Sequence, residues 1–200
     1  MNLPNKLTIL RVVLIPFMMF FYLADFILYG IGKLVALAIF IIASLTDMLD
    51  GQIARKRNLV TNFGKFLDPI ADKMLTSAML FMLVADHTIP APYGAIIITI
   101  IISREFMVSA LRLLVASRGT VLAADKWGKI KTVVQMIAIP VCVVLSYLYT
   151  CGFNTPNALV LTFEILSYTL IGLATVLTVI SGINYIVKNR HAFKEDAKQD

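Results

Sequence analysis

The feature that most limits how this chain can fold is a series of apolar segments, each long enough to cross a bilayer. A membrane-spanning helix needs about 20 mostly apolar residues. Such segments are expected at Leu7–Leu28, after a cap at or near Asn5, and then at Gly32–Arg55, Gly64–Ala85, Tyr93–Ser117, Lys126–Tyr149 and Pro156–Lys188. Hydrophobic residues make up 59% of the chain and charged residues 15%, whereas soluble domains carry about 25% charged residues. We therefore predict an all-α, polytopic integral membrane protein of about six transmembrane helices, with residues 1–200 forming a single domain.

The positions of lysine and arginine predict the orientation of these helices. With an even number of spans, both termini lie on the same side, and Lys33 is the one basic residue of 18 that falls on the other side. Because cytoplasmic loops are enriched in Lys and Arg, we predict cytoplasmic termini in the cell membrane. The net charge of +6 is then explained by loops beside anionic lipid, and no nucleic-acid partner is expected.

Four aspartates interrupt the apolar pattern around the turn between the second and third expected helices. Asp47 and Asp50 are three residues apart and share a helix face; Asp68 and Asp72 are four apart on the next helix. An ionised Asp in a transmembrane helix costs about 2.5–3.5 kcal/mol, and clustered carboxylates repel unless a cation joins them. Carboxylate oxygens suit Mg²⁺ or Mn²⁺, and four of them could hold two such ions bridging a phosphate.

The residues between the aspartates also suit a phosphate ligand. Gly51, Ala54 and Gly64 are small, so they leave room for a bulky ligand close to the backbone. Arg55 is the expected counter-charge for a phosphate oxygen. The cluster is therefore expected to be a phosphate site at the cytoplasmic membrane face.

The pattern D-x-x-D-G-x-x-A-R, eight residues, then G-x-x-x-D-x-x-x-D resembles the signature of the CDP-alcohol phosphotransferases, with every fixed position present. The resemblance implies that Asp47, Asp50, Asp68 and Asp72 hold two divalent ions and that Gly51, Ala54, Arg55 and Gly64 line the site of the cytidine diphosphate donor. It also implies that Asp72 is the general base, a choice that spacing alone does not make, and that the protein is a homodimer. The family transfers a phospho-alcohol group from a CDP-alcohol to a second alcohol and releases CMP.

Three further segments bear on the second alcohol. PNKLTILRVVLIP, ISREF and WGKIKTVVQM resemble bacterial members of the family that use CDP-diacylglycerol as donor and sn-glycerol 3-phosphate as acceptor, giving phosphatidylglycerophosphate. A phosphorylated acceptor calls for basic side chains. The candidates for binding its phosphate are Thr8, Arg11, Arg112, Arg118, Lys129 and Lys131. The neighbouring residues Arg104 and Glu105 are alternatively interpreted as a buried structural pair that holds helices together.

Two other interpretations remain open at this stage. One is a related enzyme of the same family, such as a cardiolipin, phosphatidylserine or inositol-phosphate synthase. The other is a cation or proton transporter, since carboxylates within a membrane also mark ion paths. A transporter is expected to place ionisable groups near the bilayer midplane in repeated halves, and no internal repeat is visible in this chain.

Overall fold

The computed structural model describes residues 3–24, 29–56, 62–117, 126–153 and 157–188, without the side chains of 3–5, 47–56, 62–66, 68 and 113–117. The described chain is helical throughout, apart from short connections. The helices are α1 (Leu3–Leu23), α3 (Ile31–Lys56), α4 (Asn62–Ala85), α5 (Tyr93–Ser117), α6 (Lys126–Thr150) and α7 (Ala158–Lys188). The all-α architecture expected from the sequence is confirmed.

Five of these helices begin and end within two residues of the predicted bounds, and α1 is the exception. It begins at Leu3, four residues before the predicted start, so the cap expected at or near Asn5 is wrong. The reason is that Pro4 is tolerated in a first helical turn, where its missing N–H has no partner to lose. The predicted end at Leu28 lies outside the described residues.

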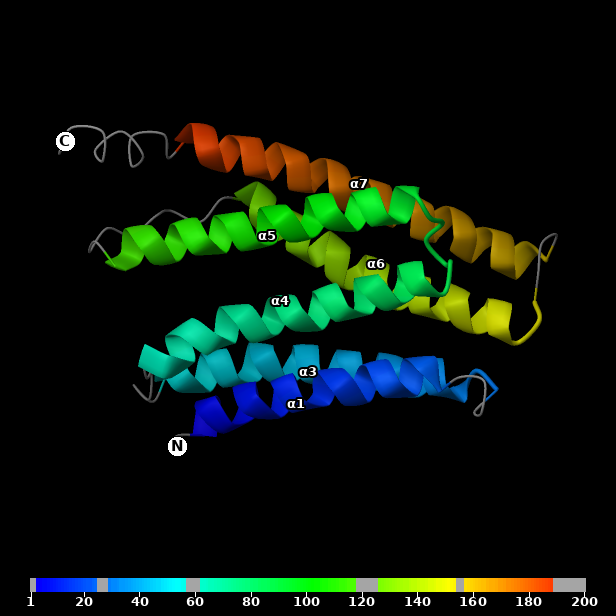
Figure 1. Ribbon diagram of the computed structural model, residues 1–200, viewed down its shortest axis with the longest axis horizontal. Coiled ribbons are helices and arrows are strands. Elements are labelled where there is room, and N and C mark those ends of the chain that lie inside the picture. The colour runs from blue at the N-terminus through cyan, green and yellow to red at the C-terminus, as the bar shows by residue number, and fades with distance from the viewer. Residues whose placement is uncertain (1–2, 25–28, 57–61, 118–125, 154–156, 189–200) are drawn as a thin grey trace.

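The helices run side by side and alternate in direction, so their ends collect at two opposite ends of one bundle (Figure 1). The starts of α1, α4 and α6 lie at one end together with the last turns of α3, α5 and α7. The most extensive packing is between α6 and α7 and between α1 and α3, and α4 contacts α1, α5 and α6. The aspartate-rich turn between α3 and α4 therefore lies at the same end as the basic connection between α5 and α6.

Small residues lie where the helices pack on one another, and many large apolar side chains lie on the outside of the bundle. The interior contains alanines that are at most 1% exposed: Ala36, Ala43, Ala71, Ala138 and Ala174. Small residues at such contacts let membrane helices approach closely. Large apolar side chains such as Phe20, Phe81 and Ile165 are more than half exposed, which is the expected outer surface of a bundle in lipid. By length and composition, α1, α5, α6 and α7 can cross a membrane, and α3 has a shorter apolar part, Ile31–Thr46.

A buried polar network joins four helices at the end of the bundle away from the aspartates. The Lys33 ammonium of α3 lies 3.3 Å from the carboxylate of Asp86, which follows α4. It also donates to Thr150 Oγ1 at 2.7 Å and to the carbonyl of Ser146, both on α6. The Tyr22 hydroxyl of α1 donates to the same Asp86 oxygen at 2.6 Å. The network thereby satisfies a buried lysine and connects α1, α3, α4 and α6.

The protonation of Asp86 follows from this network. Burial alone raises the pKa of the carboxyl, but hydrogen bonds from Ser146, Tyr22 and Thr88 outweigh burial and hold the pKa below its ordinary value. A carboxylate whose pKa is lowered on folding stabilises the fold above its unfolded pKa of about 3.9. That stabilisation is lost as the pH falls through the folded pKa.

Replacing Lys33 by Met is expected to destabilise the protein, because it leaves the Asp86 carboxylate buried without its cation. Breaking one half of a buried ion pair costs about 3 kcal/mol, which for a chain of this size lowers the melting temperature by about 10 °C. Thermal unfolding in detergent measures it. The double variant K33M/D86L should recover most of the loss, and Lys6→Met, at an exposed lysine of α1, should cause none. A Lys33→Met protein that melts like wild type would show that the pair adds no stability.

Candidate functional site

The helix ends place the sequence pattern at one end of the bundle. Asp47, Asp50, Gly51, Ala54 and Arg55 lie in the last turns of α3, and Gly64, Asp68 and Asp72 lie in the first half of α4. The side chains of all but Asp72 are outside the described part of the structure. The backbone therefore places the two halves of the pattern on two helices, α3 and α4. Asp72 is the one residue of the pattern whose side chain is described.

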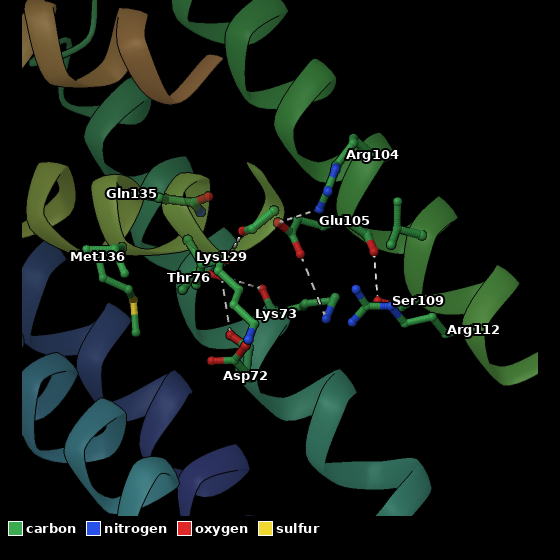
Figure 2. Close-up of a pocket in the computed structure, with 14 residues that line it drawn as sticks. Asp72, Lys73, Thr76, Arg104, Glu105, Ser109, Arg112, Lys129, Gln135 and Met136 are labelled. Atoms are coloured by element: carbon green, nitrogen blue, oxygen red, sulfur yellow. Dashed lines mark hydrogen bonds and ion pairs between the residues drawn. The ribbon is translucent and has the colours of Figure 1, made fainter. Parts of the chain in front are cut away.

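Asp72 lies on the wall of a pocket of about 410 Å³ between α4, α5 and α6 (Figure 2). The polar side chains of its lining are Asp72, Lys73, Thr76, Arg104, Glu105, Ser109, Arg112, Lys129, Thr132 and Gln135. Val108, Val133 and Met136 supply an apolar part. Four of the lining side chains are cationic and two are carboxylates, so the described lining favours an anionic ligand.

Two cationic side chains from different helices reach this pocket with Asp72. Lys129 of α6 extends toward Asp72 in Figure 2. Arg112 of α5 has its guanidinium carbon 5.8 Å from the centre of the Tyr185 ring of α7. A guanidinium over an aromatic face gains a cation–π attraction. Tyr185, which is 1% exposed, therefore contributes to the position of Arg112.

Glu105 of α5, which lines the pocket, lies close to three cationic side chains. Its Oε1 lies 2.5 Å from Lys131 Nζ of α6 and 3.6 Å from Nη1 of Arg104. Its Oε2 lies 3.8 Å from Lys73 Nζ of α4. Because the Lys131 side chain is 1% exposed, its ammonium is shielded from water and depends on its contact with Glu105. Glu105 thereby joins α4, α5 and α6 around the pocket.

The residues predicted to bind the acceptor phosphate fall into three groups. Arg112 and Lys129 line the pocket with Asp72. Lys131 lies beside it, held by Glu105. Thr8 and Arg11 are buried in α1 and are not part of this lining, and Arg118 lies outside the described residues. Arg104 and Glu105 form an ion pair within α5, at 3.6 Å, and their interpretation as a structural pair that holds helices together stays a prediction.

Sequence reasoning missed Lys73 as a member of the pocket wall, and it did not include Arg104 or Glu105 among the candidates for binding the acceptor phosphate. A signal was available, since ionisable residues within apolar helices are costly and face the bundle interior. Lys73 and Glu105 are 32 positions apart on separate helices, and the packing of α4 on α5 brings them together. No local pattern states which of the many basic residues a given carboxylate meets.

Whether a divalent ion suits this site is decided by the chemistry of its donors. Four aspartates offer hard oxygen ligands of the kind that Mg²⁺ and Mn²⁺ take. Asp72 presents its carboxylate at the pocket wall. Within the described residues, no group of three or more His, Cys, Asp and Glu side chains could hold a metal, and three of the four aspartates lie outside that search. The carboxylate donors of the pattern are therefore of the type that suits divalent cations.

Comparison with known proteins identifies the class to which this fold and site belong. The family model described as CDP-alcohol phosphatidyltransferase matches residues 1–180. The chain therefore belongs to the CDP-alcohol phosphatidyltransferase family, and the resemblance inferred from the aspartate pattern is confirmed.

Individual relatives narrow the class. The chain is 44% identical over 206 residues to a Bacillus subtilis protein, covering 96% of this chain and 97% of the relative. It is 34% identical over 184 residues to one from Rickettsia felis, covering 92% and 93%, and 44% identical over 141 residues to one from Haemophilus influenzae, covering 69% and 73%. All three relatives are named CDP-diacylglycerol--glycerol-3-phosphate 3-phosphatidyltransferase.

Proposed function

We propose that this protein transfers the phosphatidyl group of CDP-diacylglycerol to sn-glycerol 3-phosphate, giving phosphatidylglycerophosphate and CMP. The observation that carries the proposal is similarity over nearly the whole length of the chain to relatives with that printed name, 96% of this chain in the Bacillus subtilis case. The pocket supports it, because a carboxylate of the family pattern and several cationic side chains line one cavity of suitable charge.

The donor is proposed to bind at the junction of α3 and α4. Gly51, Ala54, Arg55 and Gly64 would line the site of the cytidine diphosphate. Asp47, Asp50, Asp68 and Asp72 would hold two divalent cations, Mg²⁺ or Mn²⁺. When bound, such ions stabilise negative charge on the transferred phosphate and on the leaving CMP.

Asp72 is proposed as the general base. Its carboxylate takes the proton of the acceptor hydroxyl, and the hydroxyl oxygen forms a bond to the phosphatidyl phosphorus. The bond from that phosphorus to the CMP oxygen breaks, and CMP leaves with the electron pair. The pocket supports this role because Asp72 lines the cavity in which an acceptor would lie.

The acceptor phosphate is proposed to bind among the basic side chains opposite Asp72. Arg112 and Lys129 line the pocket, and their separation on α5 and α6 allows them to contact one phosphate from two sides. Lys131, Thr8, Arg11 and Arg118 remain further candidates on the basis of the sequence. A phosphate dianion would offset the excess of positive charge in the described lining.

The membrane position is part of the same proposal. The acyl chains of the donor would stay in lipid while its diphosphate reaches the end of the bundle that carries the aspartates. We place that end at the cytoplasmic face of the cell membrane, since the basic residues lie there. A homodimer is also proposed.

An acceptor panel tests the proposed reaction. Purified protein in detergent receives CDP-diacylglycerol, Mg²⁺ or Mn²⁺, and one of four acceptors: glycerol 3-phosphate, phosphatidylglycerol, serine or inositol phosphate. CMP release is expected with glycerol 3-phosphate alone. Release with a different acceptor would transfer the assignment to a cardiolipin, phosphatidylserine or inositol-phosphate synthase. No release with any acceptor would contradict the enzyme assignment and favour the alternative of a cation or proton transporter.

A further inference from the structure

Arg104 lies on the pocket wall in a position fixed from several sides. Its side chain is 11% exposed and extends from α5 toward Glu105 and the cavity (Figure 2). A Cβ built on Gly128 of α6 would lie 3.2 Å from Arg104 Nη2, and one on Gly182 of α7 would lie 3.2 Å from its Cγ. Both contacts are tighter than ordinary van der Waals contact. The two glycines therefore leave the space that the arginine occupies.

Glu105 supplies the electrostatic part of this position. The close partner of its carboxylate is Lys131, at 2.5 Å, whereas Arg104 lies 3.6 Å away. The longer separation exceeds hydrogen-bond length, so Arg104 is attracted to Glu105 without forming a bidentate pair with it. Glu105 thus attracts the guanidinium of Arg104, and both side chains line the pocket.

A guanidinium held in this way suits a phosphate oxygen. Its planar fork matches phosphate geometry, and a nearly buried cation is screened less by water than an exposed one. Arg112 and Lys129 line the same pocket, and Asp72 is on its wall. An anion contacting Arg104 would therefore lie in the cavity that also holds the proposed base.

We propose that Arg104 binds the phosphate of the acceptor and that Glu105 is the positioning residue that holds Arg104 there. The inference rests on the proposed function and adds two residues to its acceptor site. It also explains Gly128 and Gly182, since both leave room for the Arg104 side chain, Gly128 beside its guanidinium and Gly182 beside its Cγ. The reaction requires no additional group.

Arginine variants test the contact directly. Arg104→Met is expected to raise the KM for glycerol 3-phosphate about tenfold, the effect of one lost charge-assisted hydrogen bond. The KM for CDP-diacylglycerol should stay within about twofold of wild type, and Arg104→Lys should restore part of the loss. Stabilisation of the protein by glycerol 3-phosphate, read as a melting-temperature shift without donor, should weaken in parallel. Ser103→Ala, at an exposed neighbour, is the matched control.

A substitution at Gly182, which is not part of the pocket lining, tests the positioning of Arg104. Gly182→Ala should displace Arg104 and raise the KM for glycerol 3-phosphate about threefold, since a displacement of a few tenths of an ångström weakens a hydrogen bond without removing it. Gly172→Ala makes the same substitution in the same helix, where an added Cβ meets nothing within 4 Å. It should leave that KM unchanged.

Glu105→Gln is expected to raise the same KM about tenfold, and it needs a control for folding because Lys131 loses its partner. The double variant E105Q/K131M removes both buried charges, which is often tolerated. A folded double variant whose KM exceeds that of Lys131→Met alone supports positioning, whereas a return to the wild-type KM would show a purely structural role and overturn the inference. An unchanged KM in Arg104→Met would overturn it as well. If wild type releases no CMP with glycerol 3-phosphate, the proposed function fails instead, and the two failures are thereby distinguished.

Discussion

Asp72→Asn is expected to lower the rate of CMP release about a thousandfold, within the range known for the loss of a general base. Asparagine has the size of aspartate but cannot take the proton of the acceptor hydroxyl. The position matters because Asp72 shares its pocket with Arg112 and Lys129, so a phosphate bound by these two cations would bring its alcohol toward the carboxylate. Initial rates with saturating CDP-diacylglycerol and glycerol 3-phosphate measure the effect.

Two comparisons separate the roles that Asp72 could have. Mn²⁺ binding, followed by electron paramagnetic resonance, should be largely retained in Asp72→Asn, because three aspartates and an amide oxygen remain. A variant that loses the metal together with turnover would show that Asp72 acts mainly as a ligand, and one that stays active would show that the base is another residue. Glu164→Gln removes a carboxylate from α7 outside the pocket and should retain wild-type activity.

The helices could be read from the sequence because one physical demand sets them. A bilayer requires about 20 apolar residues for each span, and the bounds found for α5 and α6 follow from Tyr93 and Lys126 at the edges of such segments. The predicted start of α1 was wrong because a proline in the first turn, here Pro4, does not prevent the helix from beginning before it. For the other five helices, the length of the apolar segment was sufficient to predict both ends within two residues.

The pocket could be predicted only in part, since its walls come from helices that are distant in sequence. Arg112 and Lys129 were predicted from their charge together with the phosphorylated acceptor that the family resemblance implied, and both line the pocket. The pairing of Lys131 with Glu105 joins residues 26 positions apart, and that of Lys33 with Asp86 joins residues 53 apart. Charge pattern shows that buried cations need partners. Which partner each one finds depends on how α3, α4, α5 and α6 pack, and single-helix periodicity does not encode that packing.

Removal of divalent cations is expected to abolish CMP release, by more than about a thousandfold. Three powers of ten correspond to about 4 kcal/mol of transition-state stabilisation, and a Lewis acid on a phosphoryl oxygen supplies several kcal/mol. Dialysis against a chelator, followed by return of Mg²⁺ or Mn²⁺, measures the loss and its recovery. Activity that persists after chelation would contradict the proposed role of Asp47, Asp50, Asp68 and Asp72.

The same cations should stabilise the folded protein without any substrate, because they relieve the repulsion among four carboxylates at the start of α4 and the end of α3. At 100 times the dissociation constant, a ligand that binds only the folded state adds about 2.7 kcal/mol, or roughly 8 °C in melting temperature for a chain of this size. NaCl at matched ionic strength should not reproduce the increase, since screening acts on all surface charges alike. The double variant D68N/D72N should melt at a temperature that no longer depends on Mg²⁺, because replacing two of the four carboxylates removes both the repulsion and the ligands that relieve it. If Mg²⁺ still raises the melting temperature of that variant, the cation binds elsewhere in the protein, and the aspartates would need another explanation for their position at a membrane surface.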